Sequence, residues 1–249
     1  MTEPITSRKN PLIQRVRRLL SSRKARLEEG LFVADGTKLL YEAAKWWPGL
    51  KTVLHTPDID PEVPEGVEKI CISRELMEYV SPMETPQGAL FLCALPEEKP
   101  LEVVPGMVIL DGIQDPGNLG TILRTADAMG IPVVLLEGCA DPYSHKVVRA
   151  SMGAVFRSVP SVSTWEQVKK ACAEEKIPVA VTALSSEAKD IRHTDLSKMA
   201  VVIGSEGQGV RQEILRAADR QLIIPMSEKC ESLNAAVAAT IVLWEMRKR

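Results

Sequence analysis

Hydrophobic and polar positions follow short periods between residues 30 and 95. Apolar runs bounded by turn residues predict strands, and apolar residues three or four positions apart predict helices. The predicted strands cover 31–35, 51–55, 68–72 and 89–95, and the predicted helices cover 37–47 and 74–80. These elements together predict a small α/β unit.

From Met107 onward the pattern changes to strands that alternate with helices. The predicted strands are 107–113, 132–138, 158–163, 178–184, 200–205 and 221–226. The predicted helices lie near 118–129, 145–153, 164–176, 210–218 and 232–248. This alternation is typical of an α/β fold in which helices cover both faces of a mostly parallel sheet.

Residues 96–106 (PEEKPLEVVPG) separate the two patterns. The segment combines three prolines with charged residues and carries few helix or strand signals. Such a composition is typical of a linker between domains. In a chain of 249 residues, the pattern predicts a first domain at 1–96, a linker at 97–106 and a second domain at 107–249.

The composition is that of an ordinary globular protein. Hydrophobic residues make up 45% and charged residues 26% of the chain, which excludes collagen, a wholly disordered chain and a disulfide-rich scaffold. No stretch resembles a membrane span or a signal peptide, which predicts a cytoplasmic protein. The cysteines form no Cys-x-x-Cys pair and predict neither a metal site nor a disulfide framework: Cys71, Cys93, Cys139, Cys172 and Cys230.

Residues 4–27 are strongly basic, although the formal net charge of the whole chain is −2. Two interpretations of this segment remain open. It forms a solvated helix face, or it contacts the phosphates of a nucleic acid, because clustered Lys and Arg release counterions from such a backbone. The segment holds eight basic side chains and no acidic one: Arg8, Lys9, Arg15, Arg17, Arg18, Arg23, Lys24 and Arg26.

The first of three strand-to-helix junctions is DGIQDPGNLGTILRTADAMG (111–130). Ligands of open α/β sheets bind where such junctions lie, at the carboxyl ends of the strands. Asn118 is placed to cap the helix, and neighbouring glycines permit a tight turn. We expect Arg124 on an otherwise apolar stripe, where a buried arginine needs an anion. Capping and a surface arginine would also explain this segment.

The second junction is VVIGSEGQGV (201–210). Its glycines have the order G-x-x-G-x-G, which is not the dinucleotide-binding order G-x-G-x-x-G, and the chain contains no phosphate-binding loop of the G-x-x-x-x-G-K-[ST] type. A dinucleotide-dependent enzyme or a nucleoside triphosphatase is therefore disfavoured. Glu206, between two glycines, is placed where a helix N-terminus could stabilise its charge.

The third junction is IIPMSEKCESLNAAVAATIVLWEMRKR (223–249). Ser232 is placed to cap the last helix, and Asn234 would then lie two residues inside that helix. Structural capping explains Ser232 as well as catalysis does.

Taken together, the three junctions resemble the motifs of the TrmH/SpoU family of SPOUT-class RNA 2′-O-ribose methyltransferases. The matching stretches occur in the family's order and spacing: NLGTILRTADAMG (118–130), IGSEGQG (203–209), IPM (224–226) and ESLNAAVA (231–238). Residues 7–43 resemble the substrate-binding domain of the ribosomal-RNA branch, although Asp35 stands where many relatives carry glutamate.

This resemblance implies a fold and a cofactor. The C-terminal stretch of the sheet would thread a loop into a deep trefoil knot, which chains almost never form. The first domain would be a small, ribosomal-protein-like RNA-binding domain. Family members bind S-adenosylmethionine in the knot and act as homodimers, and no metal is implied. The cofactor contacts implied for this chain are Gly204, Ile224 and Leu233, with Thr182 and Ala183 adjoining.

The resemblance also implies the reaction, a methyl transfer to a ribose 2′-hydroxyl. Ribosomal RNA of the 23S type is the favoured substrate; transfer RNA, or an RNA-binding protein of this fold without catalysis, are the alternatives. Arg124 resembles the family's catalytic arginine, and we expect it to clamp a phosphate and stabilise the developing alkoxide rather than remove a proton. Asn118, Glu206, Ser232 and Asn234 would orient the ribose and Arg124. Aromatic residues make up 4% of the chain, which predicts little base stacking.

Overall fold

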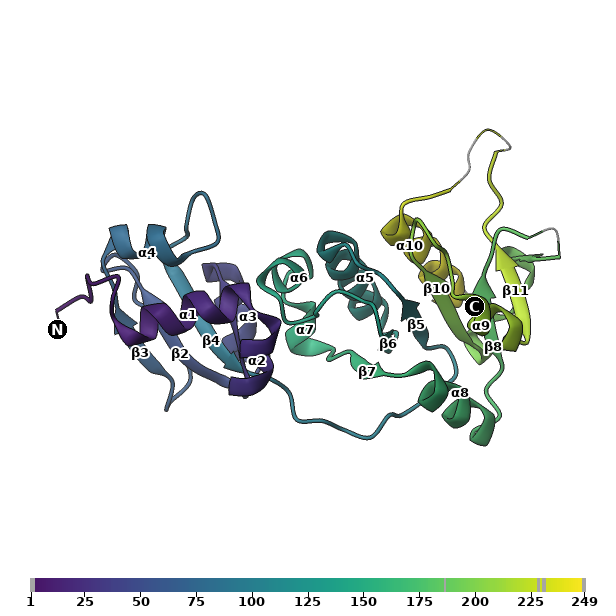
Figure 1. Ribbon diagram of the computed structural model, residues 1–249, viewed down its shortest axis with the longest axis horizontal. Coiled ribbons are helices and arrows are strands. Elements are labelled where there is room, and N and C mark those ends of the chain that lie inside the picture. The colour runs from purple at the N-terminus through teal and green to yellow at the C-terminus, as the bar shows by residue number, and fades with distance from the viewer. Residues whose placement is uncertain (1–2, 186, 228, 230–231, 248–249) are drawn as a thin grey trace. The chain divides into compact units, whose positions relative to one another are not determined.

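The computed structural model describes residues 3–185, 187–227, 229 and 232–247 (Figure 1). The chain forms two compact units. The first combines Met1–Glu97 with Asp141–Arg157, and the second combines Glu98–Ala140 with Ser158–Arg249. The expected linker carries neither helix nor strand between residues 95 and 107, all of which are described.

The first unit is built on a mixed sheet with the strand order β1-β4-β2-β3. Strand β4 runs antiparallel to β1 and β2, and β2 runs parallel to β3. The strands are β1 (Leu31–Asp35), β2 (Leu50–His55), β3 (Glu68–Cys71) and β4 (Ala89–Ala94). The helices are α1 (Pro11–Ser21), α2 (Arg23–Glu29), α3 (Thr37–Trp46), α4 (Arg74–Val80), α6 (His145–Ala150) and α7 (Ala154–Arg157). The small α/β unit predicted from the sequence is therefore observed.

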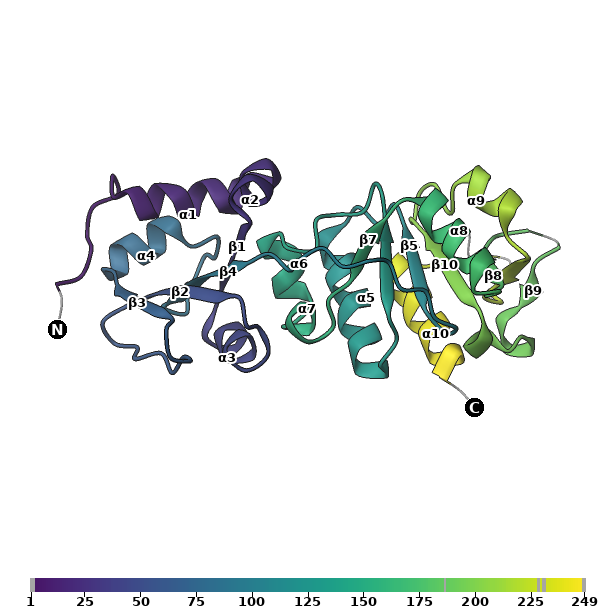
Figure 2. The ribbon, with the colours of Figure 1, turned by 90° about the horizontal axis from the view of Figure 1, so that it is seen from below.

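Alternate side chains of this sheet face two different cores, because successive residues of a strand point to opposite faces. Val33, Leu90 and Leu92 pack with the buried residues of α1 and α4 on one face. Figure 2 shows α3 on the opposite side of the sheet from α1 and α4.

The segment 141–157 belongs to the first unit because its aromatic side chains complete the second of these cores. The ring of Phe32 on β1 lies 5.1 Å from that of Tyr143 and 6.3 Å from that of Phe156, measured between ring centroids. The sequence pattern assigned these residues to the domain 107–249, and it predicted one helix at 145–153. The structure has two helices there, separated by Met152 (φ 50°) and Gly153 (φ 83°), whose left-handed backbone interrupts a helix.

The second unit is built on a parallel sheet with the order β7-β6-β5-β10-β8-β11-β9, which confirms the fold class expected for this region. Its strands are β5 (Val108–Asp111), β6 (Val133–Leu136), β7 (Ser161–Ser163), β8 (Val179–Thr182), β9 (Lys189–Asp190), β10 (Ala200–Gly204) and β11 (Arg220–Ile223). Its helices are α5 (Pro116–Met129), α8 (Trp165–Glu174), α9 (Gln212–Ala217) and α10 (Ala235–Arg247), with 3-10 turns η1 (Ile191–His193) and η2 (Leu196–Lys198). The two-residue strand β9 was not expected from the pattern.

Helices cover both faces of this parallel sheet, as predicted. Buried residues of α8 and α9 pack with Ile109, Val181 and Val202 in one core. Helices α5 and α10 lie together on the other face (Figure 2). The carboxyl ends of β5, β10, β8 and β11 consequently share one edge of the sheet, where ligands of such folds bind.

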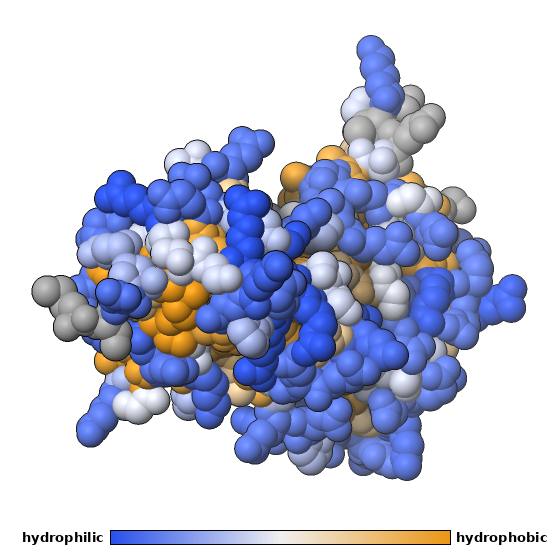
Figure 3. Space-filling model, turned by 60° about the vertical axis from the view of Figure 1, so that its left-hand side comes forward, coloured by the Kyte–Doolittle hydropathy of each residue, from blue (hydrophilic) through white to orange (hydrophobic). Residues whose placement is uncertain are grey.

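The surface is mainly hydrophilic on the face that Figure 3 presents, where hydrophobic areas are limited in extent. Among the helices in the described residues, none is long and apolar enough to cross a membrane. Four cysteines are free thiols (Cys71, Cys93, Cys139 and Cys172), and Cys230 lies outside the described residues.

Candidate active site

A polar cluster forms around the side chain of Glu206, in the loop that follows β10. Its Oε1 atom accepts hydrogen bonds from Asn118 Nδ2 at 2.6 Å, from Asn234 Nδ2 at 2.7 Å and from the backbone N–H of Ala235 at 2.8 Å. The Asn234 amide also donates to Asn118 Oδ1 at 3.1 Å. One carboxylate oxygen therefore joins the three junctions that the sequence singled out.

The N-terminus of α10 supports the charge of Glu206, as the sequence suggested for a helix N-terminus. Ala235 is the first residue of α10, so its N–H is free of intrahelical bonds and points toward an acceptor. This placement explains why a carboxylate between two glycines is held in one position at the surface.

The loop that carries Glu206 closes so tightly that Gly204 has no room for a side chain. A Cβ atom there would lie 2.1 Å from the backbone carbon of Gly209, which is far inside van der Waals contact. Backbone hydrogen bonds between Ser205 and Gly209 close the loop in both directions, and Gly209 adopts a φ of 66°. Gly204 and Gly209 therefore serve loop closure.

Asp111 ties this loop to the strand that leads into α5. Its side chain is 1% exposed, and its backbone pairs with Gly204 in the sheet register. Oδ2 accepts the backbone N–H of Arg211 at 2.8 Å, and Oδ1 accepts Arg211 Nε at 2.7 Å. Both ends of the Glu206 loop are thus held at the end of β5, seven residues before Asn118. The sequence reasoning missed Asp111, although an acid that ends a buried apolar strand was a usable signal.

The helix caps differ from those predicted. Asp115, not Asn118, caps α5, because its Oδ1 accepts the backbone N–H of Asn118 at 2.7 Å. Asn234 caps α10, because its Oδ1 accepts the N–H groups of Ala236 at 3.0 Å and Val237 at 3.2 Å. The side chain of Asn118 is therefore left to bind Glu206, while Asn234 serves both the helix and the cluster.

Ser232 does not cap the last helix. That helix begins at Ala235 rather than at 232, so Ser232 lies two residues before the capping position and is exposed. The prediction that Asn234 lies inside the helix was wrong for the same reason.

Arg124 lies on the exposed side of α5, and the expectation of an apolar stripe around it was wrong. Its neighbours Ile122, Leu123 and Ala126 are buried, whereas Arg124 itself is exposed. It follows Asn118 by six residues, which places it about 9 Å further along the helix axis. Among the described residues, its guanidinium has no hydrogen-bond or ion-pair partner, so it is free to meet an anion from outside.

Four of the residues implied as cofactor contacts converge at the carboxyl edge. Gly204 ends β10, Thr182 ends β8, and Ile224 directly follows β11. The strands β10 and β11 both pair with β8, and the N–H of Ala183 donates to the carbonyl of Leu222 at 2.9 Å. The fifth residue, Leu233, is half-buried beside the helix-capping Asn234.

This edge suits an adenosyl group chemically. The half-buried side chains of Ile224 and Leu233 are apolar, and Leu184, just past β8, is a 68% exposed apolar side chain that the sequence reasoning did not single out.

Cys139 follows β6 near this edge, and burial raises the pKa of its thiol, which donates to the carbonyl of Leu110 at 3.3 Å. A protonated, hydrogen-bonded thiol is a poor nucleophile.

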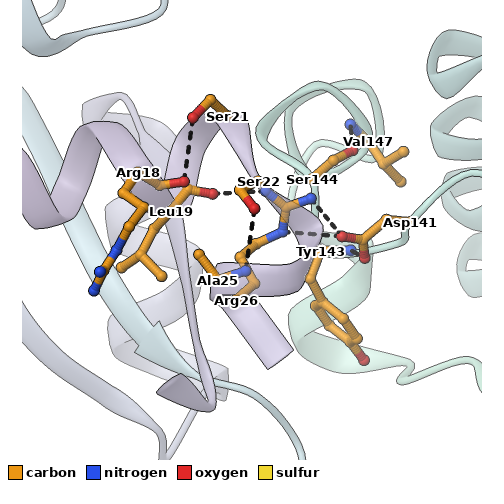
Figure 4. Close-up of polar contacts among 10 residues, drawn as sticks. All are labelled: Arg18, Leu19, Ser21, Ser22, Ala25, Arg26, Asp141, Tyr143, Ser144 and Val147. Atoms are coloured by element: carbon orange, nitrogen blue, oxygen red, sulfur yellow. Dashed lines mark hydrogen bonds and ion pairs between the residues drawn. The ribbon is translucent and has the colours of Figure 1, made fainter. Parts of the chain in front are cut away.

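Arg26 is a structural residue of the first unit (Figure 4). Only 6% of it is exposed, its Nη2 atom lies 2.6 Å from Asp141 Oδ2, and its Nη1 atom donates to the carbonyl of Leu19 at 2.6 Å. These contacts occupy the guanidinium, so Arg26 is not a phosphate contact as the charge pattern had suggested.

Four arginines of the basic segment have partners at the surface of the first unit. Arg15 and Arg18 both pair with Glu29, and the hydrogen bond from Arg15 is the largest cause of the lowered pKa of that carboxyl. Arg8 and Arg17 flank the ring of Tyr79, with their guanidinium carbons 4.4 Å and 4.5 Å from its centroid.

The other three basic residues of the segment are exposed. Lys24 Nζ lies 3.7 Å from Glu28 Oε1, and an ion pair this exposed contributes little to stability. Lys9 and Arg23 have no side-chain partner among the described residues. Seven basic side chains therefore lie at the surface of α1, of α2 and of the residues just before α1.

The structure places a polar cluster at the carboxyl edge of a parallel sheet, which is where ligands of open α/β folds bind. Residues 105–244 match the SpoU rRNA methylase family, and residues 10–90 match the MRM3-like substrate binding domain. The chain belongs to the SpoU rRNA methylase family, which confirms the resemblance seen in the sequence and the expectation of an RNA methyltransferase.

The chain is also similar to individual RNA methyltransferases. The chain is 33% identical to the 23S rRNA (guanosine(2553)-2′-O)-methyltransferase RlmP of Bacillus subtilis, over 98% of both chains. The crystal structure of an AdoMet-bound rRNA methyltransferase from Sinorhizobium meliloti superposes with a TM-score of 0.87 at 31% identity, covering 98% of this chain and 97% of that one. An RNA 2′-O ribose methyltransferase structure gives a TM-score of 0.82 at 29% identity over 98% of both chains.

Proposed function

We propose that this protein transfers the methyl group of S-adenosylmethionine to a ribose 2′-hydroxyl in ribosomal RNA of the 23S type. The observation that carries the proposal is the Glu206 cluster, which joins Asn118 and Asn234 next to the strand ends where a cofactor would bind. The names of the relatives from Bacillus subtilis and Sinorhizobium meliloti support the substrate and the cofactor.

The cofactor is proposed to contact Gly204, Thr182, Ala183, Ile224 and Leu233. When bound, S-adenosylmethionine would supply a methyl group activated by its sulfonium: the hydroxyl oxygen would form a bond to the methyl carbon in line with the breaking C–S bond, and the neutral thioether would leave with that electron pair. The apolar side chains and backbone groups of the carboxyl edge would hold the adenosyl part and exclude water. Holding the reactants in line can account for as much as about 7–11 kcal/mol of barrier reduction.

The Glu206 cluster is proposed to position the ribose. Oε1 of Glu206 is occupied by three donors, whereas Oε2 has no partner among the described residues. Oε2 can therefore accept a hydrogen bond from a ribose hydroxyl or from Arg124. Asn118 and Asn234 keep the carboxylate in place, and Ser232, two residues before Asn234, is proposed to add a hydroxyl to the ribose site.

Arg124 is proposed to bind the neighbouring phosphate and to stabilise the negative charge that develops on the 2′-oxygen. An arginine side chain stays protonated in proteins, so it serves as a cation and not as a base. The hydroxyl proton would leave to water or to a phosphate oxygen. The exposed, unpaired guanidinium of Arg124 supports this role.

The remaining parts of the proposal concern assembly. We infer a trefoil knot in the second unit. Helix α10 follows the last strand, β11, and its packing against α5 supports this inference. We infer a homodimer, supported by Val237 and Trp244 on α10, which are 48% and 62% exposed. The ribosomal-protein-like first domain (1–96), the linker (97–106), the catalytic domain (107–249, of which residues 141–157 pack in the first unit) and a cytoplasmic location complete this proposal.

The test is methylation of total RNA from a strain that lacks the gene, using radiolabelled S-adenosylmethionine and the purified full-length chain. We expect label at a ribose 2′-oxygen of ribosomal RNA, mapped by resistance to alkaline cleavage. Arg124→Ala should reduce the label by about 100-fold or more, whereas Arg216→Ala, which changes an exposed arginine on α9, should not. Label on transfer RNA alone would replace the proposed substrate, and no label on any RNA would favour a binding protein without catalysis.

A further inference from the structure

The exposed aromatic side chains of the first unit are concentrated on α3. Tyr41 is 66% exposed and Trp46 is 48% exposed. Most other aromatic residues of the chain are buried, and the only other strongly exposed aromatic among the described residues is Trp244 of the second unit. The small aromatic content therefore does not exclude base stacking, because these two rings are exposed to solvent and not packed in a core.

The fold of α3 gives no structural reason for these two rings to face solvent. Leu39, Leu40 and Ala43 form the buried side of the helix. Trp47 is also buried, and its Nε1 atom donates to the carbonyl of Ala94 at 3.0 Å. The adjacent Trp46 is exposed, so one of two neighbouring tryptophans packs in the core and the other faces solvent.

Two surface hollows adjoin these rings. One, of about 360 Å³, is lined by Lys38, Tyr41 and Met152, among others. The second, of about 400 Å³, is lined by Trp46 and Lys51, among others. Both volumes lie within the range of small-ligand sites, and each hollow has one exposed ring on its wall.

The charge around the rings is positive. Lys38, Lys45 and Lys51 are exposed and form no ion pair with any described residue. The ammonium of Lys45 lies 4.9 Å from the centroid of the Trp46 ring. Of the two carboxylates that line the hollows, Glu42 is neutralised by Arg157, and only Glu65 is unpaired among the described residues.

We propose that the solvent-exposed side of α3 binds unpaired nucleotides of the RNA substrate, with one base on Tyr41 and another, about 140° further around the helix axis, on Trp46. Lys38, Lys45 and Lys51 would neutralise the adjoining phosphates. Aromatic side chains beside flexible cations are typical of single-stranded RNA sites, whereas lysine is depleted at the centres of protein–protein interfaces. The inference rests on the proposed function only in taking RNA as the ligand.

The first experiment measures binding of a fluorescein-labelled single-stranded oligoribonucleotide of ten adenosines to the full-length chain. Tyr41→Ala with Trp46→Ala should weaken binding about tenfold for each ring removed, because stacking is abolished. Tyr41→Phe with Trp46→Phe is the matched control, and it should retain most of the affinity, because phenylalanine keeps a ring face. Both side chains are exposed, so we expect unchanged thermal unfolding of the variants.

A second readout separates stacking from a merely structural effect. The unlabelled oligonucleotide should quench tryptophan emission of the wild type, and Trp46→Phe should lose most of that quenching. With the RNA that the enzyme methylates, the double alanine variant should raise KM for RNA while kcat and S-adenosylmethionine affinity stay the same.

The outcomes distinguish this inference from the proposed function. Weaker oligonucleotide binding by the alanine variant, together with no methylation of any RNA by the wild type, would support RNA binding at Tyr41 and Trp46 and reject the catalytic proposal. Methylation with unchanged KM, unchanged oligonucleotide affinity and no change in quenching would retain the catalytic proposal and overturn the inference, leaving the face to a protein partner.

Discussion

In the first unit, the Arg26–Asp141 ion pair is almost completely removed from solvent, whereas in the second unit Arg124 is exposed and unpaired. Both arginines lie on helices and directly follow an apolar residue, Ala25 and Leu123 respectively. Arg26 pairs with a carboxylate of its own chain, on the segment 141–157 whose aromatic side chains also pack in the first unit. Arg124 keeps its charge available. Burial and pairing, more than residue type, separate a structural arginine from one that can act on a ligand.

The largest effect should follow from breaking the buried pair. Arg26→Ala leaves Asp141 with an uncompensated charge in a largely buried position, and we expect the free energy of unfolding to fall by about 3–5 kcal/mol. Chemical denaturation of the full-length chain measures this change. Arg23→Ala, at an exposed position of the same helix, should shift stability by less than about 0.5 kcal/mol. Equal stability of the two variants would contradict the structural role of Arg26.

The next effect should fall on catalysis alone. Arg124→Ala removes the cation that stabilises the developing oxyanion, and we expect methyl transfer to fall by about 100-fold to 1,000-fold or more. Affinity for S-adenosylmethionine, measured by calorimetry, should stay within a few-fold, and stability should not change because the side chain is exposed. An equal loss of cofactor affinity would make Arg124 a structural residue like Arg26.

Asp111 combines features of Arg26 and Arg124: it is buried, as Arg26 is, and it holds the Glu206 loop of the proposed active site. Asp111→Asn removes the charge that binds Arg211, and we expect a loss of about 1.5–3 kcal/mol in unfolding free energy. Methyl transfer should fall by more than cofactor affinity does, since the Glu206 loop would lose its anchor on β5. The control is Asp195→Asn, an exposed cap that asparagine fills equally well. Lower stability with unchanged transfer would show that Asp111 does not position the loop.

The smallest effect concerns the basic segment. Changing Arg15, Arg17 and Arg18 to Gln should weaken RNA binding severalfold and flatten its salt dependence, by up to about 0.7–0.9 in slope for each phosphate that is no longer neutralised. The reduction should be smaller than that expected for three phosphates, because Arg15 and Arg18 already share Glu29. Lys169→Gln with Lys170→Gln on α8 serves as the control on another helix. An unchanged slope would identify the segment as a solvated helix face.

The periodicity of the chain predicted the two patterns of strands and helices and the parallel sheet, because burial on a sheet or helix imposes a repeat that local sequence records. The motifs predicted which junctions meet, and Asn118, Glu206 and Asn234 do share hydrogen bonds. The ends of elements were less accurate. The caps at Asp115 and Asn234 depend on the residue at which each helix begins. Several neighbouring polar residues in each segment can serve as a cap, so the sequence does not fix that residue.

What the sequence determined by itself is the fold class, the family and the identity of the residues around the carboxyl edge, since each is recorded in local pattern and spacing. Only the tertiary structure decided that Arg26 is buried against Asp141, that Arg124 faces solvent, that Asp111 anchors the Glu206 loop, and that Tyr41 and Trp46 are displayed while Trp47 is not. These outcomes depend on contacts between segments up to 115 residues apart, and the energy of a charge or a ring is set by the neighbours that such contacts bring.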